Sequence, residues 1–182
     1  MIVQIRGTSG AGKSHIVRAI MERFQDRQEV FREGRKQPIY YLLDNGIRPL
    51  VVPGHYNRPC GGCDTIKTNE ETFGIVMDAE AQGRNVLFEG IMAQDAALKW
   101  MEPIKDLPHL IVGLTTPIEE CLAGIQQRRD GRGDTRPLNP NNTVNRAKSQ
   151  ERALDKLLGM GFKVERLGRQ EALDRIRMVL GA

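Results

Sequence analysis

The sequence has 182 residues, of which 40% are hydrophobic and 27% are charged, a balance that suits one globular domain. Its net charge of +4 falls short of the basic excess that would alone indicate a nucleic-acid-binding protein. Three cysteines are an odd and low number for a secreted disulfide framework, and no apolar run is long enough to cross a bilayer. The first residues also lack a signal-peptide pattern, so we expect a cytoplasmic protein.

The first half of the chain alternates short apolar runs with helical periodicity. The expected elements are a strand at 2–5, a helix at 14–24, a strand at 38–43 closed by Asp44, a short strand at 50–52 and a helix that begins at Thr68 and ends at Gly83. The charged residues 25–37 are expected to form a solvated helix end and loop. Thr68 and Glu71 have the spacing of a capping box.

The second half continues the alternation of strands and helices. The expected elements are strands at 85–88 and 110–114, a helix that opens at 116–119 with Thr116 as its cap, a mobile loop at 128–142, a helix to about Leu158, a strand from 162 and a helix at 170–180. This order predicts a single α/β domain over 1–182, with a mainly parallel sheet between two layers of helices.

The most specific motif directly follows the first predicted strand and precedes the first predicted helix. It consists of Gly7, Thr8, Ser9, Gly10, Ala11, Gly12, Lys13 and Ser14, and it fits the P-loop pattern G-x-x-x-x-G-K-[ST] at every position. The glycines let the backbone curl so that its N–H groups point at one phosphate. Lys13 can then reach the β- and γ-phosphates of ATP, and the Ser14 hydroxyl can ligate Mg²⁺. The sequence therefore predicts a three-layer P-loop NTPase fold that binds a nucleoside triphosphate.

Two further features favour a small kinase over a motor or switch. Glu89 ends a buried strand at the sheet edge where ligands bind in α/β folds, and its carboxylate can organise Mg²⁺ or act as a base, although a helix-capping role is the alternative. Residues 128–142 resemble the arginine-rich lid of adenylate-kinase-like enzymes. There Arg128 and Arg132 can stabilise the transferred phosphoryl group and Arg129 can bind the nucleotide; a solvated basic loop is the alternative.

The acceptor site is predicted within 44–68, where residues 53–64 are rich in glycine, proline and cysteine. In one interpretation His55 and Tyr56 stack on a ring, Arg58 meets a phosphate and Asp64 acts as general base toward a hydroxyl. Asp44 is a second candidate base. A zinc site made by His55, Cys60 and Cys63, a redox pair of the two cysteines, and a turn without a ligand are the other interpretations.

Together the P-loop, the G-H-Y…C-G-G-C-D segment, the Leu-Phe-Glu-Gly strand end and the arginine-rich segment resemble the phage-encoded 5-hydroxymethyluracil DNA kinases. The resemblance covers most of the chain. It implies ATP and Mg²⁺ at Gly7–Ser14, and a modified pyrimidine of DNA presented to His55, Tyr56 and Asp64. Such a base must be extruded from duplex DNA, at a cost of roughly a few kcal/mol.

Other functions of a P-loop domain stay open at this point. A small-metabolite or nucleoside kinase would have no DNA acceptor, and an ATPase or regulatory module would have no acceptor at all. The basic residues Arg146, Lys148, Arg152 and Lys156 could contact DNA phosphates or form a solvated helix face. Residues near Gly168 and Arg169 could line the pocket of the donor base, but the sequence decides neither the identity of that base nor the oligomeric state.

Overall fold

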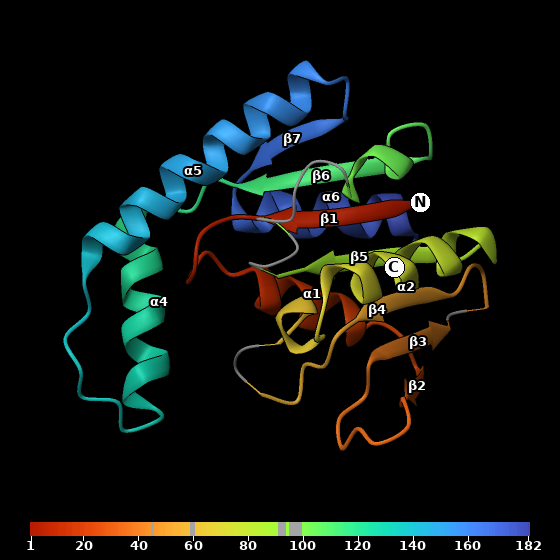
Figure 1. Ribbon diagram of the computed structural model, residues 1–182, viewed down its shortest axis with the longest axis horizontal. Helices are drawn as coiled ribbons and strands as arrows, with labels where there is room; N and C mark the ends of the chain where they lie inside the picture. The colour runs from red at the N-terminus through yellow and green to blue at the C-terminus, as the bar shows by residue number, and fades with distance from the viewer. Residues whose placement is uncertain (45, 59–60, 91–93, 95–99) are drawn as a thin grey trace.

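A seven-stranded sheet forms the centre of the computed structural model, which describes residues 1–44, 46–58, 61–90, 94 and 100–182 (Figure 1). The strands are β1 (Ile2–Arg6), β2 (Asp26–Val30), β3 (Tyr40–Asp44), β4 (Leu50–Pro53), β5 (Asn85–Glu89), β6 (His109–Leu114) and β7 (Val164–Leu167). Their order is β2-β3-β4-β5-β1-β6-β7. The neighbours from β4 to β7 are parallel, whereas β2 and β3 are added antiparallel. The predicted α/β fold with a mainly parallel sheet is confirmed.

Helices cover both faces of this sheet and complete three layers. The helices are α1 (Lys13–Met21), α2 (Asn69–Ala81), α4 (Ile118–Asp130), α5 (Pro140–Gly159) and α6 (Arg169–Leu180), with short 3-10 turns η1 (Cys63–Thr65) and η3 (Glu102–Ile104). Successive residues of β1 point to opposite faces of the sheet and pack into different hydrophobic cores. Val3 packs with α1 and α6, and Ile2 packs with α2, η3 and α5. Among the described residues, no helix has the length and apolarity to span a membrane.

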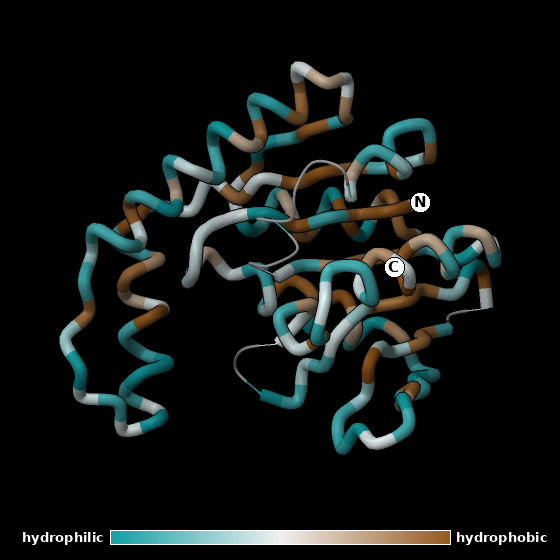
Figure 2. Tube along the Cα trace, viewed as in Figure 1, coloured by the Kyte–Doolittle hydropathy of each residue, from teal (hydrophilic) through white to brown (hydrophobic). Residues whose placement is uncertain are grey.

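The arm formed by α4, residues 131–139 and the first half of α5 extends beyond the sheet (Figure 1). Figure 2 shows that most of this arm is hydrophilic, and Cys121 is the buried residue of α4. The predicted loop begins too early, because α4 continues to Asp130 and its last turn contains Arg128 and Arg129. The arm is thus a helical hairpin with a short connection.

Two further expectations of the sequence were wrong in ways that have physical causes. Residues 26–30 form an edge strand, which pairs with β3 on one side only and therefore keeps its charged side chains in solvent. Thr116 does not cap α4; its hydroxyl donates to the Ala11 carbonyl at 2.8 Å, and Pro117 precedes the first helical residue. Thr68 does cap α2 as predicted, accepting from the Glu71 amide at 3.1 Å.

Candidate active site

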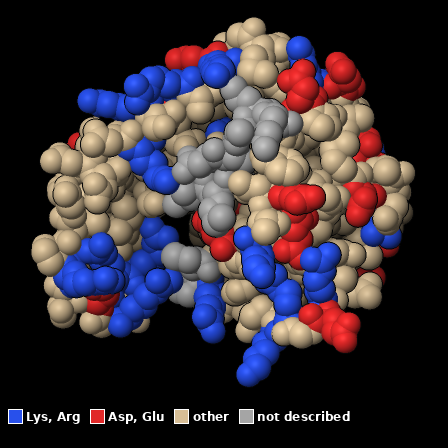
Figure 3. Space-filling view, viewed as in Figure 1, with Lys and Arg blue, Asp and Glu red and all other residues tan. Residues whose placement is uncertain are grey.

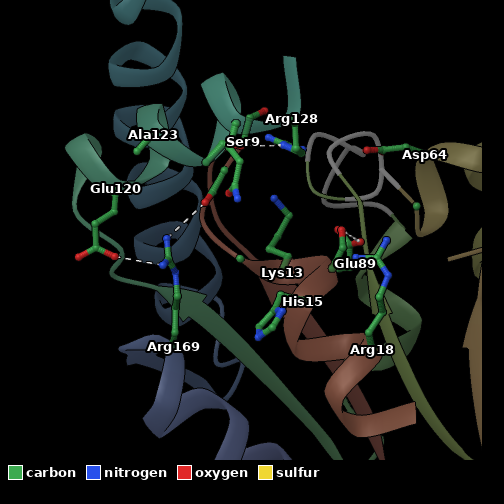
Figure 4. Close-up of a pocket in the computed structure, with 16 residues that line it drawn as sticks. Ser9, Lys13, His15, Arg18, Asp64, Glu89, Glu120, Ala123, Arg128 and Arg169 are labelled. Atoms are coloured by element: carbon green, nitrogen blue, oxygen red, sulfur yellow. Dashed lines mark hydrogen bonds and ion pairs between the residues drawn. The ribbon is translucent and has the colours of Figure 1, made fainter. Parts of the chain in front are cut away.

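A cleft of about 760 Å³ opens at the carboxyl ends of β1 and β5 (Figure 4). The P-loop and the start of α1 form its floor, α4 and the start of α6 form one wall, and Gly61, Asp64 and Glu89 lie at the other end. In Figure 4, Asp64 and Glu89 lie on one side of Lys13, and Glu120 and Arg169 lie on the other. The cleft therefore joins the P-loop, which would hold the donor, to part of the predicted acceptor segment.

Glycine is required in the P-loop because the backbone is tightly curled against α4. Gly10 has φ +80°, and a Cβ there would lie 2.1 Å from the Cys121 carbonyl oxygen. Gly12 has φ +99° and directly precedes α1, so the loop turns into the helix within one residue. The amino end of α1 thus faces the cleft, the arrangement in which backbone N–H groups bind phosphate.

Lys13 is buried at the base of the cleft, where its ammonium group donates to the carbonyls of Gly7 at 2.9 Å and Thr8 at 3.0 Å. Burial lowers the pKa of Lys13, against the opposing effect of the nearby Glu89 and Asp64 charges. An anionic group in the cleft would favour the charged ammonium. The two carbonyl contacts hold the Lys13 side chain beside the P-loop, where it is expected to bind phosphate.

Ser14 and Glu89 form a second polar pair, with the serine hydroxyl donating to Glu89 Oε1 at 2.7 Å. Glu89 ends β5 and is buried, and burial raises the pKa of its carboxyl group although Lys13 and the Ser14 hydrogen bond act in the other direction. Both groups offer oxygen atoms of the kind that Mg²⁺ prefers, and sites for Mg²⁺ with phosphate substrates need only one or two protein carboxylates. The pair therefore fits the predicted magnesium site.

The acceptor segment folds back on itself through Gly54 and Gly62. The Gly62 amide donates to the His55 carbonyl at 3.1 Å, and a Cβ on Gly54 would lie 2.0 Å from the Gly62 oxygen. Thr65 closes the turn, because its hydroxyl accepts from the His55 amide at 3.1 Å and donates to the Gly62 carbonyl at 2.7 Å. This turn holds Asp64 at the cleft, where the residue is exposed.

Side chains from distant elements hold this segment in place. Arg18 of α1 donates to the Tyr56 carbonyl at 3.3 Å and also to the Arg58 carbonyl, and Arg35 donates to the Thr65 carbonyl at 2.7 Å. The Tyr41 hydroxyl accepts from the Tyr56 amide at 3.2 Å and donates to Asn57 Oδ1 at 3.0 Å. The acceptor end of the cleft thus depends on α1 and β3.

Three of the predicted acceptor residues lie elsewhere than expected. Asp44 ends β3, which runs antiparallel to β4 and so ends at the sheet edge opposite the P-loop; its role as a base is therefore wrong. His55 and Tyr56 are only 8% and 6% exposed and do not line the cleft, so neither ring can stack on a base there. Burial and the charges of Arg58 and Arg35 lower the pKa of His55, which favours its neutral form.

The predicted cysteine site and Arg58 have different outcomes. Cys63 is a buried free thiol, and Cys60 lies outside the described residues. Within the described part of the chain, no three His, Cys, Asp or Glu side chains form a metal-binding group. Arg58 is exposed in the acceptor segment and does not line the cleft.

The predicted lid arginines separate into different environments. Arg128 lines the cleft and donates to the Gly124 carbonyl at 3.2 Å. Arg129 lines a second cavity of about 220 Å³ behind the P-loop and donates to the Arg136 carbonyl. Arg132 is exposed in the connection after α4 and does not line the cleft. Of the three, Arg128 is the one already placed beside Lys13, whose pKa its charge lowers.

Comparison with known proteins identifies the family. No family model matches the sequence. A 5-hmdU DNA kinase of Pseudomonas phage PaMx11 is 35% identical, over 100% of this chain and 97% of the relative. The chain belongs to the 5-hmdU DNA kinase family. A second 5-hmdU DNA kinase, of Pseudomonas phage M6, is 28% identical over 98% of this chain and 96% of the relative. Membership confirms the resemblance and the kinase class predicted from the sequence.

A solved deoxyadenosine kinase from M. mycoides also resembles the chain, with a TM-score of 0.49 and 15% identity over 100% of this chain and 97% of that one.

Two residues that the sequence did not assign to the P-loop support it. The Gln94 side chain accepts from the Gly7 amide at 3.0 Å, and its backbone carbonyl accepts from the Arg6 guanidinium. Arg169 donates to the Ala11 carbonyl at 3.0 Å and pairs with Glu120 at 3.1 Å, closing the other end of the cleft (Figure 4). Both brace the P-loop from positions that no local motif marks.

Proposed function

We propose that this protein transfers the γ-phosphoryl group of ATP, in the presence of Mg²⁺, to the 5-hydroxymethyl group of 5-hydroxymethyluracil in DNA. The observation that carries the proposal is the single cleft in which the P-loop meets Asp64 and Glu89. The names of the full-length phage relatives indicate the acceptor.

At the donor end, the chain supplies backbone N–H groups and a mobile positive charge. Lys13 exchanges its contacts with the Gly7 and Thr8 carbonyls for the β- and γ-phosphates, because phosphate oxygens compensate the buried ammonium better than neutral carbonyls do. Arg128 adds a second positive charge from α4, on the cleft side of Lys13. Both positive charges stabilise the negative charge on the phosphoryl group during its transfer.

At the metal end, Ser14 and Glu89 would hold the ion, directly or through its water, with the oxygen atoms that share a hydrogen bond. Mg²⁺ bound there supplies charge neutralisation between the donor phosphates. Glu89 must be ionised for this role, and Lys13 favours that state.

At the acceptor end, Asp64 accepts the proton of the hydroxymethyl group as the oxygen of that group attacks the γ-phosphorus, and ADP leaves as the bond from the γ-phosphorus to the β–γ bridging oxygen breaks. Two observations support Asp64 over Glu89 in this role. Asp64 is exposed at the cleft and is carried by the acceptor segment, whereas Glu89 is buried and bonded to Ser14. A general base must reach the proton that it removes.

The test offers γ-labelled ATP with three acceptors: duplex DNA containing 5-hydroxymethyluracil, the same duplex with thymine, and the free nucleoside. The two duplexes differ at the base by one hydroxyl, so label on the first alone identifies the acceptor atom. Label on the nucleoside alone would instead indicate a small-molecule kinase. Free phosphate with no labelled product would indicate an ATPase and would overturn the proposal.

A further inference from the structure

Helix α5 carries a row of positive charges on its outer surface. Lys148, Arg152 and Lys156 are spaced four residues apart and are exposed, so they follow one side of the helix at intervals of roughly 6 Å. We call these three residues the α5 stripe. Within the described residues, no hydrogen bond or ion pair joins any of them to an acidic side chain.

The acidic residues of the same helix are paired with an arginine outside the stripe. Arg166 of β7 donates to Glu151 Oε2 at 3.0 Å and to Asp155 Oδ1 at 2.5 Å. Glu151 and Asp155 each lie between members of the stripe in sequence, and their side chains, 51% and 69% exposed, share this one arginine of β7. The outer surface of α5 therefore keeps a net positive charge that the rest of the helix does not cancel.

The stripe begins close to the cleft. The Thr8 hydroxyl of the P-loop donates to the Thr143 carbonyl in the first turns of α5 at 3.3 Å. Arg146 follows within a turn, and its charge lowers the pKa of Lys13. At 1.5 Å per residue, the stripe lies roughly 8 to 20 Å from Thr143 along the helix. Figure 3 shows lysines and arginines along this edge of the molecule, on the same face as the hollow of the cleft.

We propose that the α5 stripe binds the backbone phosphates of DNA on one side of the modified base. The inference rests on the proposed function, because it takes DNA as the acceptor, and it adds the surface that holds the DNA beyond the cleft. Each step of the stripe spans about two nucleotides at 3.4 Å per nucleotide. The partner is thus a duplex flank, and along α5 the stripe extends roughly two to six nucleotide lengths from Thr143.

The test compares two triple variants that remove the same charge. The first is Lys148→Gln, Arg152→Gln and Lys156→Gln. The control is Arg84→Gln, Lys105→Gln and Lys163→Gln, whose positions precede the parallel strands β5, β6 and β7 and so lie at the sheet edge opposite the cleft. Each triple reduces the net charge of +4 equally. Because five of the six side chains are exposed and Arg84 is half-buried, circular dichroism should match the parent protein.

Two acceptors distinguish DNA binding outside the cleft from phosphoryl transfer inside it. They are a 30-base-pair duplex and a trinucleotide, each with one 5-hydroxymethyluracil. The stripe variant should bind the duplex on the order of 100-fold more weakly at about 0.1 M salt, and the slope of log K against log salt should fall by about 2.7. Phosphorylation of the trinucleotide, which is too short to reach the stripe, should stay within twofold of the parent. The control triple should change the duplex affinity and the slope far less.

Equal duplex affinity and salt slope in the two triple variants would overturn the stripe while leaving the proposed function intact. A loss of trinucleotide phosphorylation equal to the loss for duplex would also overturn it, because the three residues would then act on the cleft. If the parent protein labels no hydroxymethyluracil DNA at all, the proposed function itself fails, which is a distinguishable result.

Discussion

The two ends of the cleft are built in different ways. At the donor end, the glycines of 7–14 position their own backbone, and the Lys13 ammonium group donates hydrogen bonds to carbonyls of the same loop. At the acceptor end, the turn between Gly54 and Gly62 is held by Arg18 of α1, Arg35 and Tyr41 of β3. The donor end is therefore held by contacts between residues close in the sequence, whereas the acceptor end is held by contacts between residues far apart in the sequence.

Because of this difference, substitutions at the two ends should have different effects on turnover and on folding stability. Changes at the donor end should remove turnover without much effect on folding, because few other elements depend on those side chains. Changes at the acceptor end should affect both stability and acceptor use, because the same contacts hold the segment and place Asp64. The following predictions test this separation.

The largest effect is expected from Lys13→Ala at the donor end. Loss of a buried ammonium aimed at the transferred phosphoryl group should lower kcat about 1000-fold or more. Circular dichroism should be unchanged, since among the described residues Lys13 bonds only to the Gly7 and Thr8 carbonyls of its own loop. Lys105→Ala, an exposed lysine at the opposite sheet edge, is the control and should keep full activity. Turnover in Lys13→Ala within tenfold of the parent would contradict the donor assignment.

The next effect is expected from Asp64→Asn at the acceptor end. Asparagine keeps the shape but cannot take a proton, so kcat for hydroxymethyluracil DNA should fall by about 100- to 10,000-fold, with ATP affinity retained. Asp44→Asn is the matched control, because the strand direction of β3 places Asp44 at the far edge. Equal losses in the two variants, measured as rates of labelled product, would show that Asp64 has no special role.

Gly62→Ala should disturb the acceptor end through its backbone. Gly62 has φ +78° and ψ −159°, a conformation that is almost restricted to glycine, and a Cβ there would lie 2.6 Å from the Glu89 carbonyl and carboxylate oxygens. We expect a loss of about 1–3 kcal/mol in the free energy of unfolding, measured with urea, and weaker acceptor phosphorylation.

Gly34→Ala is a control with a similar φ but no close contact. Gly34 has φ +76°, yet a Cβ there meets nothing within 4 Å. Its free energy of unfolding should therefore fall by less than that of Gly62→Ala. If the two losses are equal, the close approach of Gly62 to Glu89 contributes nothing measurable.

The same contrast explains what could be predicted from the sequence. The P-loop, the Glu89 strand end and the Thr68 cap depend on residues that are close in the chain, and each lies where it was predicted. Asp44 was misplaced because an apolar run does not reveal the direction of its strand. β2 was missed because an edge strand with exposed side chains lacks a hydrophobic period.

Three residues whose structural role the sequence did not indicate have contacts that cross the fold. Gln94 reaches the Gly7 amide, and Arg169 reaches Ala11 from the other end of the chain. Tyr56 has an aromatic ring suited to stacking, but it is enclosed between Tyr41 and Arg18 instead. A side chain in a glycine-rich loop can either hold the loop in place or contact the substrate. Its neighbours in the folded protein determine which of these roles it has.

The smallest effect tests that support directly. Tyr41→Phe removes the hydroxyl that joins the Tyr56 amide to Asn57, so the acceptor segment should lose about 1 kcal/mol of stability. Tyr40→Phe, one residue away on the same strand, is the control and should stay within about 0.5 kcal/mol of the parent. ATP affinity should be unchanged in both variants, whereas kcat/KM for hydroxymethyluracil DNA should fall in Tyr41→Phe alone. A parallel loss of ATP affinity would show that the two ends of the cleft are mechanically coupled, contrary to their separate construction.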